Sequence, residues 1–341
     1  MTTNPRWPQI TDKPFKGQVP QDRPDLLARV FRLKLKKLMG FLKRGVFGEM
    51  LAWLYSIEFQ KRGLPHVHIL VWLVLRDRVH PNMIDKVISA EIPSSSLDPE
   101  LHAIVKAHMV HGPCGALNRS SPCMKDGKCS KKFPKEFVKF TEQGQDGYPR
   151  YQRRSPADGG HIAKIKMQQV EQAVDNQWIV PYNPWLLRQM NCHVNVELCM
   201  SIKSIKYVLK YVNKGCDQAV YTIQPIEQQQ NADEIKKFQQ ARFVGSCEAA
   251  WRILDFPLHE RFPPAIPLAV HLENGQRVYF TEQTAMERAT ARPPPTTLTE
   301  FFALCQRDAF AQTLTYLDVP RFYTWNQSRN VWNHHKHLEP E

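Results

Sequence analysis

GLPHVHILVWL (Gly63–Leu73) places two histidines one residue apart inside an apolar run. With the preceding MLAWLYSIEFQ (Met50–Gln60) it predicts a β-hairpin whose strands are joined by the turn KRGLP. Side chains alternate between faces along a strand, so one face of this hairpin is apolar and faces a core. The other face collects the polar side chains, namely Ser56, Glu58, Gln60, His66 and His68.

A five-residue turn would set Gln60 opposite His66 and Glu58 opposite His68. Directly opposed side chains lie about 4.5–5.5 Å apart at Cβ, so two imidazoles and a carboxylate would converge. Such a set leaves coordination positions open, which is typical of a catalytic metal site. We therefore expect His66, His68 and Glu58 to be metal ligands, with Gln60 as an alternate to Glu58. The other interpretation is a pair of hydrogen-bonded histidines at a sheet surface.

The composition favours a globular protein with a polyanionic partner. The 341 residues are 42% hydrophobic and carry a formal net charge of +13, which makes nucleic acid the simplest partner. We see no apolar run long enough to span a membrane and no secretory signal, so we expect no membrane association. Without a secretory signal the eight cysteines are expected to be reduced, so we consider metal binding before disulfides.

A long amphipathic helix is expected to begin near Pro24, a residue suited to a first helical turn. Its apolar positions recur at helical spacing, and basic residues fill the remaining positions. Those basic residues suit either DNA phosphates or a solvated face. Further helices are predicted at 82–90, 98–109 and 201–215, and a strand at 193–199. The apolar stripe of the first helix consists of Leu27, Phe31, Leu35, Leu38 and Leu42.

The stretch KSIKYVLKYVNKG (203–215) carries two tyrosines on one predicted helix face. At about 100° per residue, Tyr207 and Tyr211 lie about 40° apart, and Lys214 lies within about 20° of Tyr207. A tyrosine hydroxyl is a poor nucleophile unless a metal or another cation assists it. A phosphodiester polarised by a divalent ion is its natural substrate. Packing is the other ordinary role for two tyrosines on a helix.

One His and three Cys follow at the spacing His111-x2-Cys114-x8-Cys123-x5-Cys129. These four residue types make a closed tetrahedral Zn²⁺ site, with His108 as a possible replacement for His111. Free thiols are the alternative. The lysines around the cluster could contact a DNA backbone. They are Lys125, Lys128, Lys131, Lys132 and Lys135.

EFQKRGLPHVHILVWL followed by KSIKYVLKYVNKG resembles the Rep-type HUH endonuclease domain of Helitron transposases, also called the Helitron helicase-like domain. The resemblance extends over nearly the whole chain. It also includes NPRWPQI, HGPCGALNRSSPCMKDGKCSKKFPKEF, VPYNPWLL, HVNVELC and EAAWRILDFPLHE. It implies rolling-circle nicking and joining of single-stranded DNA through a 5′-phosphotyrosyl link, and a nuclear location.

The resemblance also assigns roles to individual residues. His66 and His68 become ligands of a catalytic Mg²⁺ or Mn²⁺, and Tyr207 and Tyr211 become paired nucleophiles. Lys214 matches the lysine of the tyrosine motif. Glu58 fits the third metal ligand, while Gln60 and Glu197 stay open as alternates.

The fold class expected is α+β, with an antiparallel sheet carrying helices on one face as in HUH/Rep nucleases. We expect this domain at 1–222 with the Cys/His insertion at about 108–135, and a linker at 223–237. A small accessory α+β region at 238–325 and a loose tail at 326–341 would follow.

Two departures from the family pattern lead to further expectations. The family has an apolar strand just before the motif that reads Asn4-Pro5-Arg6-Trp7 here, whereas this sequence starts at Met1. It also lacks the G-x4-GK[ST] phosphate loop of the helicase domain expected in full-length members. These departures point to a fragment, and they keep a non-catalytic DNA-binding remnant as the alternative function. A zinc hydrolase using His66, His68 and Glu58 is a further alternative.

Overall fold

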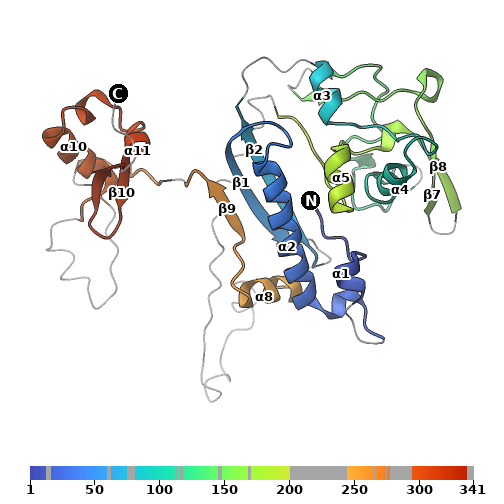
Figure 1. Ribbon diagram of the computed structural model, residues 1–341, viewed down its shortest axis with the longest axis horizontal. Coiled ribbons are helices and arrows are strands. Elements are labelled where there is room, and N and C mark those ends of the chain that lie inside the picture. Colours follow the sequence, from blue (N-terminus) through green and yellow to red (C-terminus); the bar gives the residue numbers. More distant parts are fainter. Residues whose placement is uncertain are drawn as a thin grey trace. The chain divides into compact units, whose positions relative to one another are not determined.

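The computed structural model divides the chain into two compact units, Met1–Phe262 and Pro263–Glu341. Helices and strands of both units are drawn in Figure 1. The structure describes residues 1–12, 17–59, 63–74, 81–112, 114–115, 118–144, 148–167, 170–199, 244–264, 266–273, 275–276 and 294–335.

A three-stranded antiparallel sheet organises the first unit. It consists of β1 (Met50–Phe59), β2 (Pro65–Leu73) and β9 (His259–Phe262), in the order β2-β1-β9. Helix α2 (Pro24–Lys43) lies along this sheet, and α8 (Ser246–Ile253) packs against α2 (Figure 1). The predicted α+β class with an antiparallel sheet and helices is confirmed.

The apolar stripe of α2 forms the main core, as its spacing predicted. Leu27, Phe31, Leu35, Leu38 and Leu42 are all buried. Burying each large apolar side chain stabilises the fold by about 1.5–3 kcal/mol. The stripe packs against the apolar face of the hairpin and against Trp251 of α8, which meets Phe31 edge to face at 6.1 Å between ring centroids. One residue of the predicted apolar face, Leu51, is instead 63% exposed, next to an irregularity in the pairing.

The first residues of the chain extend this sheet beyond β2. The backbone nitrogen of Val67 donates to Met1 O at 2.9 Å, and Thr2 pairs with His66 as an isolated bridge. Thr2 N in turn donates to His193 O at 3.0 Å. The strand predicted at 193–199 does not form as a regular strand, because Val196 N bonds to Pro181 O and Leu198 N to the Tyr151 hydroxyl instead of to a neighbouring strand.

A second core of the first unit lies among short elements between 88 and 190. Buried Arg153 connects segments of this core, because its Nη1 donates hydrogen bonds to the carbonyls of Asn176 and Ile179 at 2.6 and 2.7 Å. Burial lowers the pKa of Arg153 to about 10, so it stays charged at neutral pH. These short elements are α4 (Pro99–His108), α5 (Pro184–Met190), β5 (Glu142–Gln143), β6 (Pro149–Arg150), β7 (Ala163–Met167) and β8 (Val170–Val174), with 3-10 turns at Pro156–Asp158 and Asn176–Trp178. The first unit also contains α1 (Pro8–Thr11), α3 (Pro81–Val87) and a 3-10 turn at Pro20–Asp22.

The second unit has its own small core. It comprises α10 (Thr297–Arg307), a 3-10 turn at Ala311–Thr313, α11 (Val319–Phe322), and a hairpin of β10 (Tyr323–Asn326) and β11 (Val331–His334). Leu304, Ala311, Val319, Tyr323 and Trp332 are buried together. Strand β11 therefore lies inside the stretch expected as a loose tail, and α8 and β9 lie in the first unit although they were expected in the accessory region.

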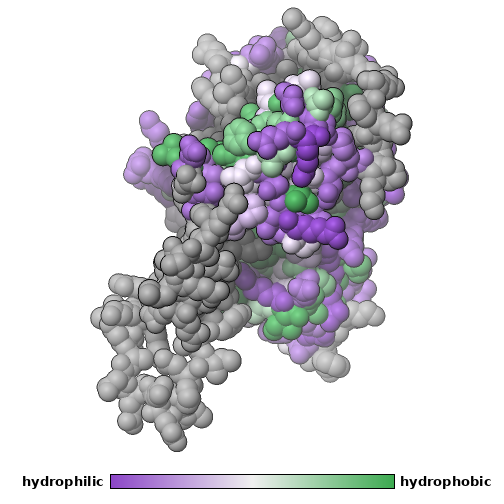
Figure 2. Space-filling view, turned by 90° about the vertical axis from the view of Figure 1, so that its left-hand side faces the viewer, coloured by the Kyte–Doolittle hydropathy of each residue, from purple (hydrophilic) through white to green (hydrophobic). Residues whose placement is uncertain are grey.

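The outer surface is mixed in character. In Figure 2, the coloured part of the face is largely hydrophilic, with hydrophobic side chains in separate groups. Among the described residues, no helix combines the length and apolarity needed to cross a membrane.

Candidate functional site

The β1–β2 register places Glu58 and both hairpin histidines on one face. Glu58 is opposite His66, and Ser56 is opposite His68. The predicted partners were Gln60 for His66 and Glu58 for His68, so each histidine is paired two residues earlier on β1 than predicted. The reason is that β1 ends at Phe59 and not at Gln60, and β2 begins at Pro65 and not at His66. A shift of two leaves every side chain on its original face. The same polar side chains therefore share one face, but their cross-strand partners differ from the predicted ones.

The three side chains lie close together. Glu58 Oε2 is 3.3 Å from His68 Nε2, so the carboxylate reaches its diagonal neighbour on β2. The imidazole centroids of His66 and His68 are 4.6 Å apart. All three side chains are partly buried. Two nitrogen donors and one carboxylate are thus available from a two-stranded platform.

His66 is held neutral and fixed in orientation. Burial is the main cause that lowers its pKa to about 3, with smaller contributions from the Met1 amino group, His68 and His193. Its Nδ1 shares a hydrogen bond of 2.7 Å with the Thr2 hydroxyl. A metal-ligating histidine commonly uses one ring nitrogen for the metal and the other for such a partner. The arrangement leaves His66 Nε2 as the nitrogen for an ion.

A third histidine, His259, reaches the same sheet face from β9. It is opposite Ser56, which is itself opposite His68, so His68, Ser56 and His259 form one row across three strands. Sequence reasoning missed His259 because β9 has four residues and lies far along the chain from the hairpin. Only the strand pairing identifies its face.

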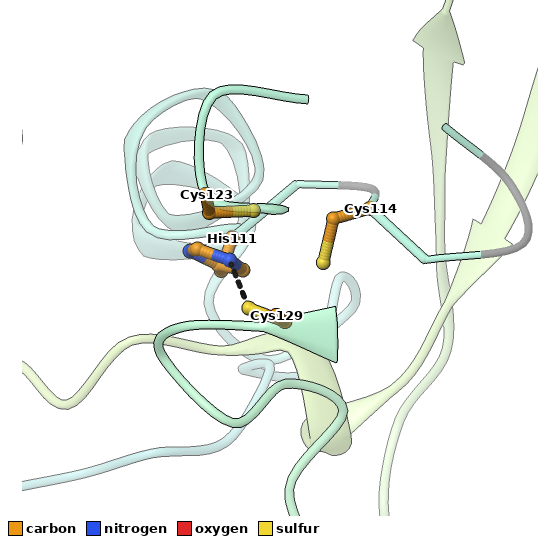
Figure 3. A group of neighbouring side chains, drawn as sticks. All are labelled: His111, Cys114, Cys123 and Cys129. Carbon is orange, nitrogen blue, oxygen red and sulfur yellow. Dashed lines mark hydrogen bonds between the residues drawn. The ribbon is translucent and has the colours of Figure 1, made fainter. Parts of the chain in front are cut away.

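The Cys/His cluster is the tighter of the two candidate sites. Among the described residues, one group of three or more His, Cys, Asp or Glu side chains has ligand atoms all within 4.8 Å of one another. This group is His111, Cys114, Cys123 and Cys129, and Figure 3 shows the four side chains converging. The ligand atoms of Glu58, His66 and His68 on the hairpin are not all this close to one another.

The four ligand residues lie in or beside short structural elements. His111 follows α4, and its backbone nitrogen donates to Trp178 O at 2.8 Å. Cys123 directly precedes, and Cys129 ends, a two-pair hairpin of β3 (Met124–Lys125) and β4 (Lys128–Cys129). Its turn residues, Asp126 and Gly127, both have positive φ, as a tight two-residue hairpin turn requires.

The thiols are crowded enough to affect one another's protonation. Burial first, and then Cys129 and Cys123, raise the pKa of the Cys114 thiol to about 12. Burial also acts to raise the pKa of Cys129, but the backbone of Phe133 and Lys131 and the two neighbouring thiols lower it below its ordinary value. A divalent cation would relieve this crowding, because it neutralises the thiolates that otherwise repel one another.

His111 meets the cluster with its ring in the neutral form. Burial, Lys135, Lys131 and His193 lower its pKa, in that order. Its Nε2 lies 3.4 Å from Cys129 Sγ, and Phe133 stacks on the other side of the ring at 4.1 Å between centroids. Zinc bonds of about 2.0–2.3 Å in a tetrahedron put ligand atoms about 3.5–3.8 Å apart. The cluster could therefore bind a metal such as zinc after small movements.

The remaining expected site residues are either outside the described part of the chain or bonded elsewhere. Tyr207, Tyr211, Lys214 and Gln60 lie outside the described residues. His108, the possible replacement for His111, uses its Nε2 on Asn191 Oδ1 at 3.2 Å. The exposed Glu197 accepts from Asn195 Nδ2 at 3.1 Å, and it is not part of the cluster.

A family model described as the Helitron helicase-like domain at the N-terminus matches residues 1–71. The match runs through α2 and β1 into β2, so it includes Glu58, His66 and His68. No curated protein matches the chain. Residues 1–71, about a fifth of the chain, are therefore similar to the N-terminal helicase-like domain of Helitron proteins.

Proposed function

We propose that this protein nicks and rejoins single-stranded DNA in a metal-dependent reaction, as in rolling-circle Helitron transposition. The observation that carries the proposal is the shared face of Glu58, His66 and His68, inside the segment matched by the family model. The net charge of +13 supports a DNA substrate.

The donor set of the hairpin fits a divalent ion. His66 Nε2, an imidazole nitrogen of His68 and the Glu58 carboxylate would hold Mg²⁺ or Mn²⁺ with open positions for a phosphate. When bound, the ion polarises the scissile phosphate and stabilises the charge that develops on it. The Thr2 hydroxyl holds the His66 ring through Nδ1, which leaves Nε2 as the ligand nitrogen.

The nucleophiles proposed on sequence grounds are Tyr207 and Tyr211. The phenolate oxygen of one tyrosine attacks the phosphorus, the P–O3′ bond breaks, and the departing O3′ takes a proton to become a free 3′-OH. The 5′-phosphate remains esterified to the tyrosine, so no external energy source is needed for rejoining. Lys214 would favour the phenolate form through its positive charge.

A non-catalytic DNA-binding remnant is the second candidate. The observation that favours it is the looser grouping of Glu58, His66 and His68 compared with the Cys/His cluster. A remnant would bind DNA through its basic residues but would leave no covalent adduct.

Zinc is proposed to occupy the Cys/His cluster in a structural role. Three thiolates and one imidazole close a tetrahedral site and leave no position for substrate. This ion would be separate from the catalytic Mg²⁺ or Mn²⁺.

The decisive experiment incubates the full chain with a 5′- or 3′-labelled single-stranded oligonucleotide and Mn²⁺. We expect a shortened DNA product and a denaturation-resistant protein–DNA adduct, both abolished by EDTA and by His66→Ala/His68→Ala. The matched control, His102→Ala/His161→Ala, removes two imidazoles of the first unit that lie away from this face. Undiminished nicking by the hairpin double variant would reject the metal assignment. Binding without any adduct in the unmodified protein would favour the remnant.

A further inference from the structure

The segment that carries the cluster has no hydrophobic core of its own. Within the described residues, none of the four hydrophobic cores includes a side chain from 114–140. Its regular structure between Cys123 and Ser130 is a hairpin of two residue pairs. A two-stranded hairpin of this kind is at best marginally stable in water. The Cys and His ligands are therefore the groups that could hold the segment in one conformation.

Two lysines of this hairpin occupy paired positions in which their charges destabilise it. Lys125 and Lys128 are directly opposite each other in the β3–β4 pairing, and both are exposed. Like charges in directly opposed positions destabilise a strand pair. Lys131 and Lys132 follow immediately and are also exposed. The stretch 111–135 contains a single acidic residue, Asp126, so this charge is not balanced locally.

We propose that zinc held by the cluster orders a lysine knuckle, consisting of Lys125, Lys128, Lys131 and Lys132, that binds the phosphodiester backbone of single-stranded DNA. The proposal deepens the proposed function and rests on it for the identity of the polyanion. Phosphate fits the knuckle because all four lysines are exposed, and an ammonium group is a point charge that binds phosphate oxygens without reading base sequence. Lys135 is different, since its Nζ donates to Lys131 O at 2.9 Å and lies over the Phe133 ring.

A chain of hydrogen bonds runs from the histidine face to the end of α4, which lies just before the segment that carries the knuckle. Thr2 contacts His66 through its hydroxyl and His193 O through its backbone nitrogen. His193 Nδ1 in turn bonds to the carbonyl of His108 at 2.8 Å. His108 ends α4 and stands three residues before the ligand His111. We therefore place the knuckle beyond the end of this path, on the course of a DNA strand that is bound at the histidine face.

The expected effect follows from counterion release. For single strands, each phosphate contact contributes about 0.7 to the slope of log K against log salt. Loss of four such contacts would reduce this slope by about 2–3 and would weaken binding by roughly 10–100-fold at moderate salt.

The test measures fluorescence anisotropy of a labelled single-stranded oligonucleotide with the full chain over a series of salt concentrations. We expect Lys125→Gln/Lys128→Gln/Lys131→Gln/Lys132→Gln to show the reduced slope. The charge-matched control, Lys36→Gln/Lys106→Gln/Lys164→Gln/Lys166→Gln, alters four exposed lysines elsewhere and should retain more of the slope. Equal effects of the two quadruple variants would overturn the proposal, because the knuckle would then be merely a part of the overall charge.

Zinc dependence is tested separately with Cys114→Ser/Cys123→Ser and by elemental analysis of the protein. This variant should lack the zinc found in the unmodified chain and should lose the same part of the slope, and adding the four Gln substitutions should cause no further loss. An unchanged slope without zinc would overturn the ordering role. His66→Ala/His68→Ala separates this proposal from the nuclease function, since it should lose nicking while the knuckle's contribution to the slope stays intact.

Discussion

Glu58 lies directly opposite His66 in the β1–β2 pairing, yet its carboxylate contacts His68, at 3.3 Å. The carboxylate is therefore close to one of the two imidazoles that the sequence predicts as metal ligands, while its backbone is paired with the other. From this position it could complete the ion site itself or orient His68 for that role.

Glu58→Ala should weaken the apparent affinity for Mn²⁺ in the nicking reaction. Removing a ligand, or the partner that orients one, commonly lowers metal affinity by about 10–100-fold. We therefore expect little activity at low Mn²⁺ and partial recovery at high Mn²⁺, while DNA binding changes little. The measurement is a Mn²⁺ titration of nicking rate. Glu197→Ala is the control, and if it has the larger effect, Glu197 and not Glu58 is the third ligand.

His259→Ala should reduce nicking although β9 was not part of the predicted site. The row formed by His68, Ser56 and His259 puts a third imidazole on the face where the phosphate would bind. We expect a loss of about 10-fold in rate or in apparent Mn²⁺ affinity, as for other groups that support a metal site. His259→Gln, which keeps a hydrogen-bonding group, should recover part of the loss. Rates equal to those of the unmodified protein would place His259 outside the reaction.

Tyr207→Phe should eliminate the covalent adduct, because it removes the oxygen that forms the phosphoester. Tyr211→Phe should still give an adduct but should impair joining to a second strand. Mass spectrometry of the DNA-linked peptide assigns the attachment site. An adduct found only on Tyr211 would reverse the two roles.

Patterns that repeat along a single element could be predicted from the sequence. The helical spacing of Leu27, Phe31 and Leu35 is a local property, and it identified the buried face of α2 correctly. The polar face of the hairpin was also predicted, since an error of two residues in register does not change which face a side chain occupies. The spacing of the cysteines likewise indicated the cluster that the structure brings together.

Pairings between distant segments could not be predicted in the same way. The contact of Thr2 with His66 and the position of His259 depend on which strands become neighbours, and no periodicity in either segment encodes that choice. The cap of α10 shows a smaller difference of the same origin. The sequence Thr297-x2-Glu300 matches the capping-box pattern. The box is formed instead by Thr296 and Thr299, because Thr297 is buried and its hydroxyl bonds to Tyr316.

A pH-dependent contribution to stability is expected at Asp98. Its carboxylate accepts a hydrogen bond from Leu101 N at 3.1 Å at the start of α4 and pairs with Arg188 of α5. Burial acts to raise the pKa of Asp98. The Leu101 N–H and the Arg188 guanidinium together lower it by a larger amount, so the pKa in the folded state lies below the ordinary value. The ionised form is thus favoured by folding.

The stabilisation by Asp98 is therefore fully present above the pKa of an unfolded aspartate, about 3.9, and is lost as pH falls through the lower folded value. Asp98→Asn keeps a capping side chain but removes the charge, so it isolates the pairing with Arg188. Partly exposed pairs contribute up to about 1 kcal/mol, which corresponds to roughly 2–4 °C in Tm for a unit of this size. Thermal unfolding monitored by circular dichroism should show this difference at neutral pH and a convergence of the two proteins in acid. A constant difference across the whole pH series would mean that the charge of Asp98 contributes nothing, and that the substitution acts only through the cap.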